Sequence, residues 1–385
     1  MNPRVRIGVL CDPREESWPS MDLVAEMLLA EWKGPLASEV EATEIDVAIS
    51  RLARRVPTLA NAHVAFNVDR IAARFVTYPA RAIAERRRHR FFHVVDHSYA
   101  QLVHALPAAR TGVFCHDLDA FRSLVNPHAE PRPAWFRALA RATMRGMQSA
   151  AVIFHSTRPV RDLLVSHGIV RAERLVHAPY GVSPEFVAED HPCPEADAIL
   201  ERLGGRPFLF HVGSAIPRKR IDVLFEVFAR LRVKHPELRL VQQGGGLSAP
   251  QRAHAVTLGI EPFLVQPAKL PRSALAALYR RAAIVLQPSE SEGFGFPIIE
   301  ALACGARVVA SGIPVLREVG GEAIDYCPVG EIDAWVHRVD ALLSEKASPP
   351  RREDRLRQAG LFTWRRHGRT ILDAYQALQP DLLGR

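Results

Sequence analysis

Residues 288–311 read PSESEGFGFPIIEALACGARVVAS and carry the strongest local pattern of the chain. The stretch follows an apolar run at 283–287, which predicts a buried strand. It also precedes a helix expected to begin at Pro297, because proline lacks the N–H that the first helical turn leaves unpaired. A strand, a glycine-bearing loop and a helix in this order predict a parallel α/β sheet. In such sheets ligands bind beyond the carboxyl ends of the strands.

The chemistry of this loop suits a ligand that carries both phosphates and hydroxyls. Gly293 and Gly295 allow close approach of an anion, and a helix N-terminus adds free N–H groups. Glu292 at the start of the loop and Glu300, expected in the first helical turn, are good acceptors for hydroxyl groups. These residues therefore predict a sugar-nucleotide site. The alternative is that Glu300 only favours the helix dipole and the glycines only form a turn.

Two further stretches of the same half point to phosphate. In FHVGSAIPRKRIDVLFEVF, residues 210–228, Gly213 ends a predicted strand, and Arg218 and Lys219 precede the next helix. Two cations there can neutralise a diphosphate and stabilise it as a leaving group. The alternative is a solvated basic turn. Three glycines at 244–246 follow another strand and indicate either a nucleotide contact or an ordinary turn.

Strand and helix patterns alternate along the whole chain, and this alternation predicts two consecutive Rossmann-like α/β domains. A polar, proline-bearing segment at 188–197 is expected to link them, and a last helix is expected at 362–378 after a break at 348–355. The expected strands are 5–10, 63–68, 91–95, 111–115, 150–154, 175–178, 207–212, 238–242, 263–266, 283–287 and 307–310. The other expected helices are 21–32, 134–147, 222–233, 271–281 and 297–304.

Composition limits the class of protein further. The chain has 385 residues, 48% of them hydrophobic and 24% charged, so it can bury a core. Its net charge of +8 equals that of residues 51–90 alone, which hold ten arginines and two acidic residues. Five widely spaced cysteines predict neither a disulfide framework nor a zinc site, and they fit a reducing cytoplasm. No long apolar run predicts a signal peptide or a membrane-spanning helix.

The run from Glu292 to Glu300 resembles the E-x7-E signature of glycosyltransferase family 4. The resemblance continues through residues 301–331, and VGSAIPRK at 212–219 is similar to the donor-diphosphate loop of that family. YGVSPEF at 180–186 and FTWRRHGRTILDAY at 362–375 fall in the expected order. The match is strong in the C-terminal half and loose in the N-terminal half.

This resemblance implies the GT-B fold, in which two Rossmann-like domains face each other across a cleft. Residues 1–187 would bind the acceptor, residues 198–359 would bind the donor, and a C-terminal helix at 360–385 would return to the first domain. Members of the family transfer sugars with retention of configuration and usually need no metal. No cofactor is therefore expected besides the nucleoside-diphosphate sugar, which is the donor substrate.

The resemblance also implies roles for individual residues of the second half. Glu292 would support charge on the transferred sugar, Glu300 would bind the ribose, and Arg218 and Lys219 would hold the diphosphate. The other expected donor-binding residues are Gly213, Ser214, Gly293, Phe294, Gly295 and Phe296. Ser214 stands where many members carry an arginine, and Arg218 is its expected substitute.

In the first half, VFCHDLDAF at 113–121 places His116 directly after a strand, where it matches a family histidine near the reacting sugar. His116 is thus the catalytic candidate of this half. His97, after the preceding strand, is expected near the acceptor or phosphate, and Asp117 either assists or caps the next segment. The first strand is followed by CDPREESWPS, which lacks the usual glycine pair of the family. The same absence argues against a dinucleotide-dependent dehydrogenase.

The resulting prediction is a retaining hexosyltransferase that acts on a hydroxyl acceptor, a saccharide or a lipid-linked sugar. Transfer of mannose from GDP-mannose in surface-polysaccharide or lipopolysaccharide assembly is the family-level expectation. A GT-B sugar-nucleotide epimerase is one alternative. A non-enzymatic basic protein that binds nucleic acid or a membrane is another, although no nucleic acid is expected as a partner of the transferase.

The basic segment YPARAIAERRRHRFF, residues 78–92, predicts a helix beside Tyr78, Phe91 and Phe92. Such a helix could rest on an anionic membrane, which would place the protein peripherally on the inner face. The alternative is a solvated helix face. The arginines expected on this helix are Arg81, Arg86, Arg87, Arg88 and Arg90.

Overall fold

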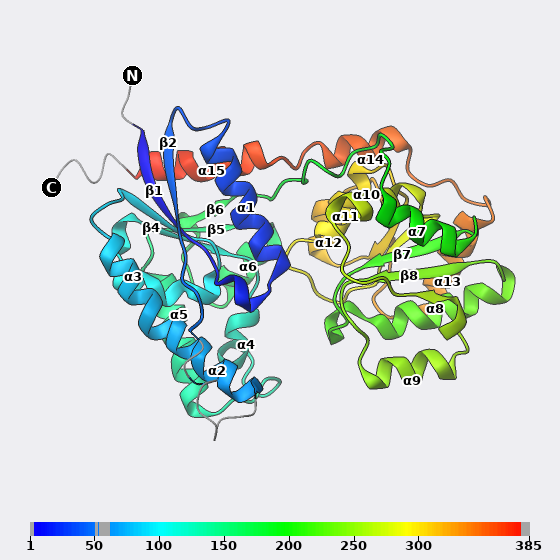
Figure 1. Cartoon of the computed structure of the whole chain (residues 1–385), viewed down its shortest axis with the longest axis horizontal. Coiled ribbons are helices and arrows are strands. Elements are labelled where there is room, and N and C mark those ends of the chain that lie inside the picture. Colours follow the sequence, from blue (N-terminus) through cyan, green and yellow to red (C-terminus); the bar gives the residue numbers. More distant parts are fainter. Residues whose placement is uncertain (1–3, 51–52, 54–61, 379–385) are drawn as a thin grey trace. The chain divides into compact units, whose positions relative to one another are not determined.

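The computed structural model describes residues 4–50, 53 and 62–378, and the chain divides into two compact units (Figure 1). Unit 1 comprises Met1–Gly181 together with Trp364–Arg385, and unit 2 comprises Val182–Thr363. The expected boundaries at 187 and 198 both lie inside unit 2. The 188–197 segment was predicted to be an irregular linker, and this is wrong from Pro194 onward, where a helix begins.

Unit 1 contains a parallel sheet of six strands in the order β2-β1-β3-β4-β5-β6. Near-continuous apolar runs identify the inner strands, because a parallel sheet is covered on both faces. Five of the strands lie at predicted positions, within two residues at either end. The strands are β1 Val5–Leu10, β2 Val40–Ile45, β3 Phe91–Val94, β4 Thr111–Cys115, β5 Val152–His155 and β6 Leu175–His177.

Helices cover both faces of this sheet. One face packs against α3 and α5 through the buried side chains of Tyr78, Ala82 and Met147. On the other face Trp32 and Tyr375 contact the ring of His93 in β3. The helices of unit 1 are α1 Pro19–Lys33, α2 Ala62–Ala72, α3 Tyr78–Glu85, α4 Arg122–Val125, α5 Ala134–Ser149, α6 Arg158–Ser166 and α15 Trp364–Ala377.

The strand predicted at 63–68 is wrong, because these residues belong to helix α2. Ala65 and Asp69, four residues apart, are buried, whereas Val64 and Val68 are exposed. The side chains thus follow the helical period rather than the alternation of a strand. The strand that was not predicted is β2, VEATEI, at the edge of the sheet. Three of its six residues are exposed, and its sequence contains no apolar run.

The single basic helix predicted at 78–92 is also wrong. Helix α3 ends at Glu85, so Arg81 lies on it whereas Arg86, Arg87 and Arg88 form the following turn. Arg90 immediately precedes β3 and is only partly exposed. The aromatic neighbours expected on a membrane surface are buried in the core: Tyr78, Phe91 and Phe92.

Unit 2 contains a second parallel sheet of six strands, in the order β12-β11-β10-β7-β8-β9. Counted along the unit, this is the 3-2-1-4-5-6 order of dinucleotide-binding domains. All five strands predicted in this half are confirmed, and β12 was not predicted. The strands are β7 Phe208–Val212, β8 Arg239–Gln243, β9 Leu264–Val265, β10 Ile284–Gln287, β11 Val308–Ser311 and β12 Asp325–Cys327.

The core of unit 2 contains the buried side chains of Phe225 and Phe228 from α8 and of Trp335 from α13. The predicted helices at 222–233, 271–281 and 297–304 are confirmed to within one residue. The break at 348–355 is shorter than predicted because α14 begins at Arg352. The helices are α7 Pro194–Leu203, α8 Ile221–Lys234, α9 Ala249–Thr257, α10 Arg272–Arg281, α11 Phe296–Ala303, α12 Pro314–Gly320, α13 Ile332–Leu343 and α14 Arg352–Ala359.

Candidate functional site

The topology of unit 2 brings two of the predicted loops together. Strands β7 and β10 are hydrogen-bonded neighbours, yet the chain leaves β7 toward β8 and leaves β10 toward β11, on opposite sides. Loops diverge at such a switch point and open a crevice beyond the strand ends. The loop after β7 contains Arg218 and Lys219, and the loop after β10 contains Glu292. A backbone bond from the Glu290 N–H to the Arg218 carbonyl, 2.9 Å, joins the two loops.

Glu292 is the centre of this loop pair. The Lys219 ammonium lies 2.6 Å from Glu292 Oε1, and Arg218 Nη1 lies 3.4 Å from Oε2. Gln287, the last residue of β10, donates its amide to Oε1 at 2.9 Å. Burial alone would raise the pKa of Glu292, but the charge and hydrogen bond of Lys219, aided by Arg218, outweigh it and lower this pKa. Glu292 is therefore an ionised carboxylate beside two cations.

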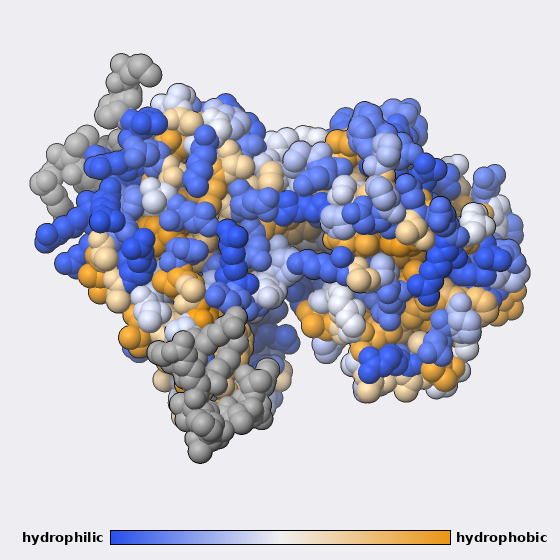
Figure 2. Space-filling view, viewed as in Figure 1, coloured by the Kyte–Doolittle hydropathy of each residue, from blue (hydrophilic) through white to orange (hydrophobic). Residues whose placement is uncertain are grey.

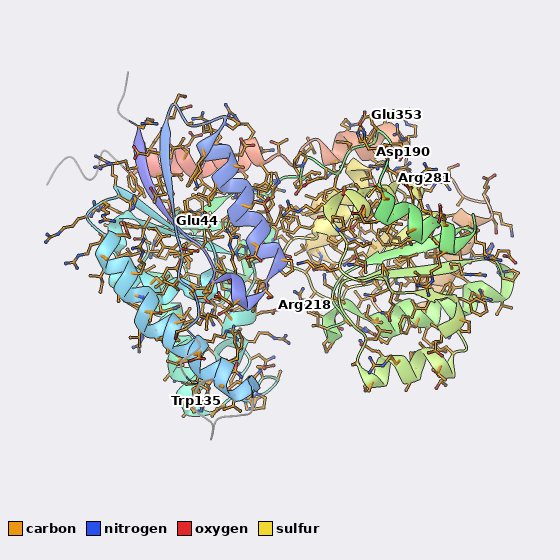
Figure 3. All side chains as sticks on the ribbon, viewed as in Figure 1. Glu44, Trp135, Asp190, Arg218, Arg281 and Glu353 are labelled. Carbon is orange, nitrogen blue, oxygen red and sulfur yellow. The ribbon has the colours of Figure 1, made fainter. Side chains whose placement is uncertain are left out.

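The loop after β7 is held by hydrogen bonds at both ends. Gly213 donates its N–H to the Gln243 carbonyl at 2.8 Å, and Gln242 donates to the Gly213 carbonyl at 3.0 Å. Ser214 is exposed, whereas Lys219 is buried in a short 3-10 turn, Pro217–Lys219. Arg218 donates a second hydrogen bond, of 3.0 Å, to the Ser291 carbonyl. Figure 3 labels the side chain of Arg218. The position of Arg218 thus depends on both loops.

The glycines after β8 have a packing role that the sequence left open. Gly244 has φ +129°, and a Cβ there would lie 2.4 Å from the carbonyl oxygen of Gly213. Only glycine allows the two backbones to approach so closely. Beneath them lies His211, buried, with no hydrogen-bond partner for either ring nitrogen among the described residues. Burial, aided by the charge of Lys219, lowers the pKa of His211 to about 3, so its ring is neutral.

The loop from Gly293 to Phe296 leads into α11, which begins at Phe296, one residue before the predicted start. Gly295 forms the N-cap with φ +101°, a conformation that favours glycine. The side chain of Phe294 is buried and packs against Phe296 and Phe362, with ring centroids 5.2 and 5.7 Å apart. The aromatic side chains therefore anchor the loop, and the backbone at the helix N-terminus is the part suited to an anion.

Glu300 lies beyond the first turn of α11, so its predicted place in that turn is wrong. It is buried, and Tyr279 of α10 donates its hydroxyl to Oε2 at 3.2 Å. Burial raises the pKa of Glu300 to about 7, although the Tyr279 hydrogen bond and the charge of Arg272 act in the opposite direction. The two carboxylates of the signature thus have opposite environments: Glu292 is paired with cations, and Glu300 is not.

In unit 1, His116 follows β4 as predicted, and its ring is fully engaged within the unit. Its Nε2 lies 2.8 Å from the Val95 carbonyl, and its Nδ1 contacts the Tyr180 hydroxyl. Its ring also stacks on Phe114 at 5.0 Å. Burial lowers the pKa of His116 to about 4. The ring is therefore neutral at pH 7, and neither nitrogen is free to move a proton without losing a bond.

His97 lies close by, with its ring centroid 5.9 Å from that of His116. Its Nδ1 is 3.1 Å from Asp96 Oδ1, and its Nε2 is 3.6 Å from Asp117 Oδ1. Burial would lower the pKa of His97, but the hydrogen bond and charge of Asp96 outweigh it and raise this pKa. Asp117 also accepts a hydrogen bond of 2.9 Å from the Asp119 N–H, so it caps the segment that follows.

Asp12 and Asp96 belong to this group, and the sequence reasoning did not single them out. They follow β1 and β3, the neighbouring strands at the switch point of unit 1. Asp12 is buried, and its Oδ1 has no partner among the described residues. Burial and the negative charge of Asp96 raise the pKa of Asp12, whereas His97 and Ser98 outweigh the burial of Asp96 and lower its pKa. Their position directly after strands was the available signal.

Comparisons with known proteins place this geometry in a class. The family described as "Glycosyl transferases group 1" matches residues 194–360, which span nearly all of unit 2. D-inositol 3-phosphate glycosyltransferase of Mycobacterium sp. (strain KMS) is 32% identical over 213 residues, covering 50% of this chain and 47% of that protein. The chain thus spans about half the length of this relative.

Two further proteins extend the likeness. GDP-mannose-dependent alpha-(1-6)-phosphatidylinositol monomannoside mannosyltransferase of Mycolicibacterium smegmatis is 28% identical over 293 residues, covering 70% of this chain and 74% of that one. Sucrose-phosphate synthase of Thermosynechococcus elongatus superposes with a TM-score of 0.70 at 16% identity, covering 98% and 100% of the two chains.

The class is therefore that of GT-B proteins with two Rossmann-like domains. Within this class, residues 194–360 of unit 2 match the group 1 glycosyltransferase family, and the resemblance expected from the sequence is confirmed for this region. Among residues 4–50, 53 and 62–378, no cluster of three potential metal ligands occurs. In the same residues, no helix has the length and apolarity that crossing a bilayer requires.

Proposed function

We propose that the protein is a retaining hexosyltransferase that takes a sugar from a nucleoside-diphosphate donor bound by unit 2. The observation that carries the proposal is the group of Glu292, Lys219 and Arg218 at the switch point, inside the matched family region. Cations at this place suit a diphosphate that gains charge as it leaves. An ionised Glu292 suits the positive charge that develops on the transferred sugar.

The rest of the donor fits residues beside this group. The backbone N–H groups at Gly295 and Phe296 offer hydrogen bonds to sugar or phosphate oxygens. Glu300, which titrates near neutrality, accepts hydrogen bonds from ribose hydroxyls best when it is ionised. Because Lys219 and Arg218 supply positive charge, we propose that the transfer needs no metal ion and no further cofactor.

The acceptor is proposed to bind unit 1 beyond β1, β3 and β4, through a hydroxyl group. Asp12, whose pKa is raised, lies with Asp96 and His97, whose Oδ1 and Nδ1 are 3.1 Å apart, in a set of carboxyl and imidazole groups that can both donate to and accept from hydroxyls. A saccharide or lipid-linked sugar meets this chemistry. GDP-mannose is the first donor to test because the mycobacterial mannosyltransferase depends on it. Surface-polysaccharide or glycolipid assembly is the proposed setting, on the cytoplasmic side of the membrane.

The test is a panel of nucleoside-diphosphate sugars offered to the purified protein, with and without sugar and polyol acceptors and with a chelator in one arm. The proposal expects hydrolysis or transfer from one donor, retention of anomeric configuration and a rate that the chelator leaves unchanged. Conversion of the sugar into its epimer without any acceptor would instead identify an epimerase. Absence of binding to every donor would refute the proposal.

A further inference from the structure

One helical surface of unit 1 exposes large aliphatic side chains beside arginines. Helix α2, a π-helical turn at Ala73–Thr77 and α3 follow one another directly from Ala62 to Glu85. Their buried residues recur mostly at intervals of four, with an interval of five across the π turn: Ala65, Asp69, Ala73, Tyr78, Ala82 and Glu85. The π turn, which takes up one extra residue, keeps this inner face directed at the core.

The outer face carries a row of exposed apolar side chains. Five large aliphatic residues are exposed along it, and Val76 at the π turn is the most exposed, at 65%. Exposed alanines fill the spaces between them. The five are Val64, Val68, Ile71, Val76 and Ile83, called here the aliphatic row. A contiguous row of this kind on a water-exposed helix marks an interaction surface.

Positive charge lies at the end of the same row. Arg81 and Arg88 are 50% and 71% exposed in their side chains, and both contact the buried carboxylate of Glu85. Arg86 and Arg87 are exposed, and within the described part of the chain no carboxylate lies within 4.0 Å of either. Figure 2 shows hydrophobic and hydrophilic residues side by side over α3.

Negative charge is missing from this surface. Between Val64 and Arg88 the exposed residues are aliphatic residues, one threonine and arginines. The two acidic residues of the stretch, Asp69 and Glu85, are both buried. A solvated helix would be expected to mix both signs of charge on its outer face. Apolar side chains together with an excess of arginines over carboxylates match a bilayer surface that presents anionic headgroups above acyl chains.

We infer that the aliphatic row and Arg81, Arg86, Arg87 and Arg88 form a docking surface for an anionic lipid bilayer. The helices lie in the plane of the interface, the aliphatic side chains enter the headgroup–acyl boundary, and the guanidinium groups contact phosphates. The inference rests on the proposed function only for its purpose, which is to bring unit 1 to acceptors held in a membrane. It replaces the surface expected from the sequence, whose aromatic residues are buried.

Flotation of the full chain with vesicles tests the inference. Vesicles of phosphatidylcholine with 30% phosphatidylglycerol should bind the protein at low salt, and pure phosphatidylcholine should bind it at least about tenfold less. The V68E/V76E variant should lose binding about tenfold or more, because charge cannot enter the acyl boundary. Its control is V233E, which changes an exposed valine of α8 in unit 2 and should leave binding unchanged.

Charge is tested by the R86E/R87E variant, which should also lose about tenfold or more, against R171E/R202E as the control of equal charge change. Melting temperatures check that each variant folds. A direct readout is V76C labelled with a polarity-sensitive fluorophore, since the five native cysteines are buried and the label should report apolar surroundings only on anionic vesicles.

Three results would overturn the inference: no flotation with anionic vesicles, flotation that V68E/V76E leaves intact, or single-stranded DNA binding as tight as vesicle binding and equally indifferent to V68E/V76E. The last result would identify a polyanion site that depends on charge alone. Donor hydrolysis and transfer to a soluble acceptor do not require the bilayer. A protein that fails to float but turns over its donor would therefore refute the docking surface without touching the proposed function.

Discussion

The two sheets have the same kind of switch point and opposite chemistry beside it. In unit 2 the strands that part are β7 and β10, and their loops bring two cations to one carboxylate. In unit 1 they are β1 and β3, and the residues that follow are Asp12 and Asp96, with His97 beside them. Topology therefore fixes where a ligand can bind, and the side chains after the strands decide whether it is a phosphate or a hydroxyl.

The largest effect should come from Glu292→Gln. The amide keeps the shape of the side chain and removes the charge that faces the sugar, so kcat should fall about 100-fold to 1000-fold with little change in donor KM. Steady-state kinetics with the identified donor measure this. Glu290→Gln is the control, because Glu290 lies in the same loop, is half exposed and pairs with Arg220. Equal losses in both variants would contradict a special role for Glu292.

A smaller effect is expected for Lys219→Met, which removes one of the two cations. Loss of a charge-assisted hydrogen bond should raise the Kd for a nucleoside diphosphate about 10-fold to 100-fold. Calorimetric titration gives this constant. In Lys234→Met an exposed lysine paired with Asp340 is lost, and donor affinity should be unchanged. If Lys219→Met bound the diphosphate as tightly as the unchanged protein, the phosphate role of this switch point would be wrong.

The corresponding test in unit 1 compares Asp96→Asn with Asp12→Asn. Asp96 is ionised and accepts bonds from the Ser98 N–H and hydroxyl, at 2.8 and 2.6 Å, so its amide variant should lose about 2–4 kcal/mol of unfolding free energy. Burial and the negative charge of Asp96 raise the pKa of Asp12, so its amide should cost less, about 1 kcal/mol at most. Urea unfolding at pH 7 measures both. Equal costs would contradict the assigned proton distribution.

Asp96→Asn also separates the proposed functions of the two units. Asp96→Asn should raise the acceptor KM about tenfold and leave the affinity for the donor within about twofold, because the donor is proposed to bind the other unit. A matching loss of donor affinity would break the division of labour between the two switch points. Asp119→Asn, in the exposed turn after β4, is the matched control for loss of a carboxylate.

The last test concerns pH and Glu300. Its pKa in the folded protein is about 7, above the ordinary value of 4.5, so the folded state binds the proton more tightly than the unfolded state. The contribution of Glu300 to stability therefore falls as pH rises from 4.5 to 7, and it stays at its lowest above that. Over this pH range the free energy of unfolding of Glu300→Gln should rise relative to that of the unchanged protein, by up to about 3 kcal/mol. Urea unfolding at pH 5, 6, 7 and 8 measures the difference, and a constant difference would contradict the raised pKa.

The strand positions of unit 2 follow well from its sequence, because its inner strands are continuous apolar runs and each is followed by a glycine or a polar loop. Unit 1 was harder for a physical reason. Residues 63–68 are rich enough in apolar side chains to predict a strand, but their exposed valines belong to the aliphatic row of a helix. The true edge strand, β2, alternates with glutamates and has no such run.

The candidate site shows the same limit. Glu292 and Lys219 could be singled out one by one, whereas their 2.6 Å contact depends on β7 and β10 being neighbours, which local patterns do not specify. Likewise, nothing near His116 in the sequence shows that Tyr180 and Val95 occupy both its ring nitrogens. Residue types predict the chemistry, and long-range packing decides which groups remain available for it.

The return of α15 to unit 1 has a consequence for synthesis of the chain. Trp32 of α1 donates its indole N–H to the Gly368 carbonyl at 3.0 Å, and Tyr375 is buried against β3 with its hydroxyl bonded to the Phe92 carbonyl at 2.9 Å. On the ribosome, unit 2 is a continuous segment and can fold as soon as it emerges. Unit 1 begins before unit 2 and is completed after it: the part of its sheet that Tyr375 covers stays open until α15 has left the exit tunnel.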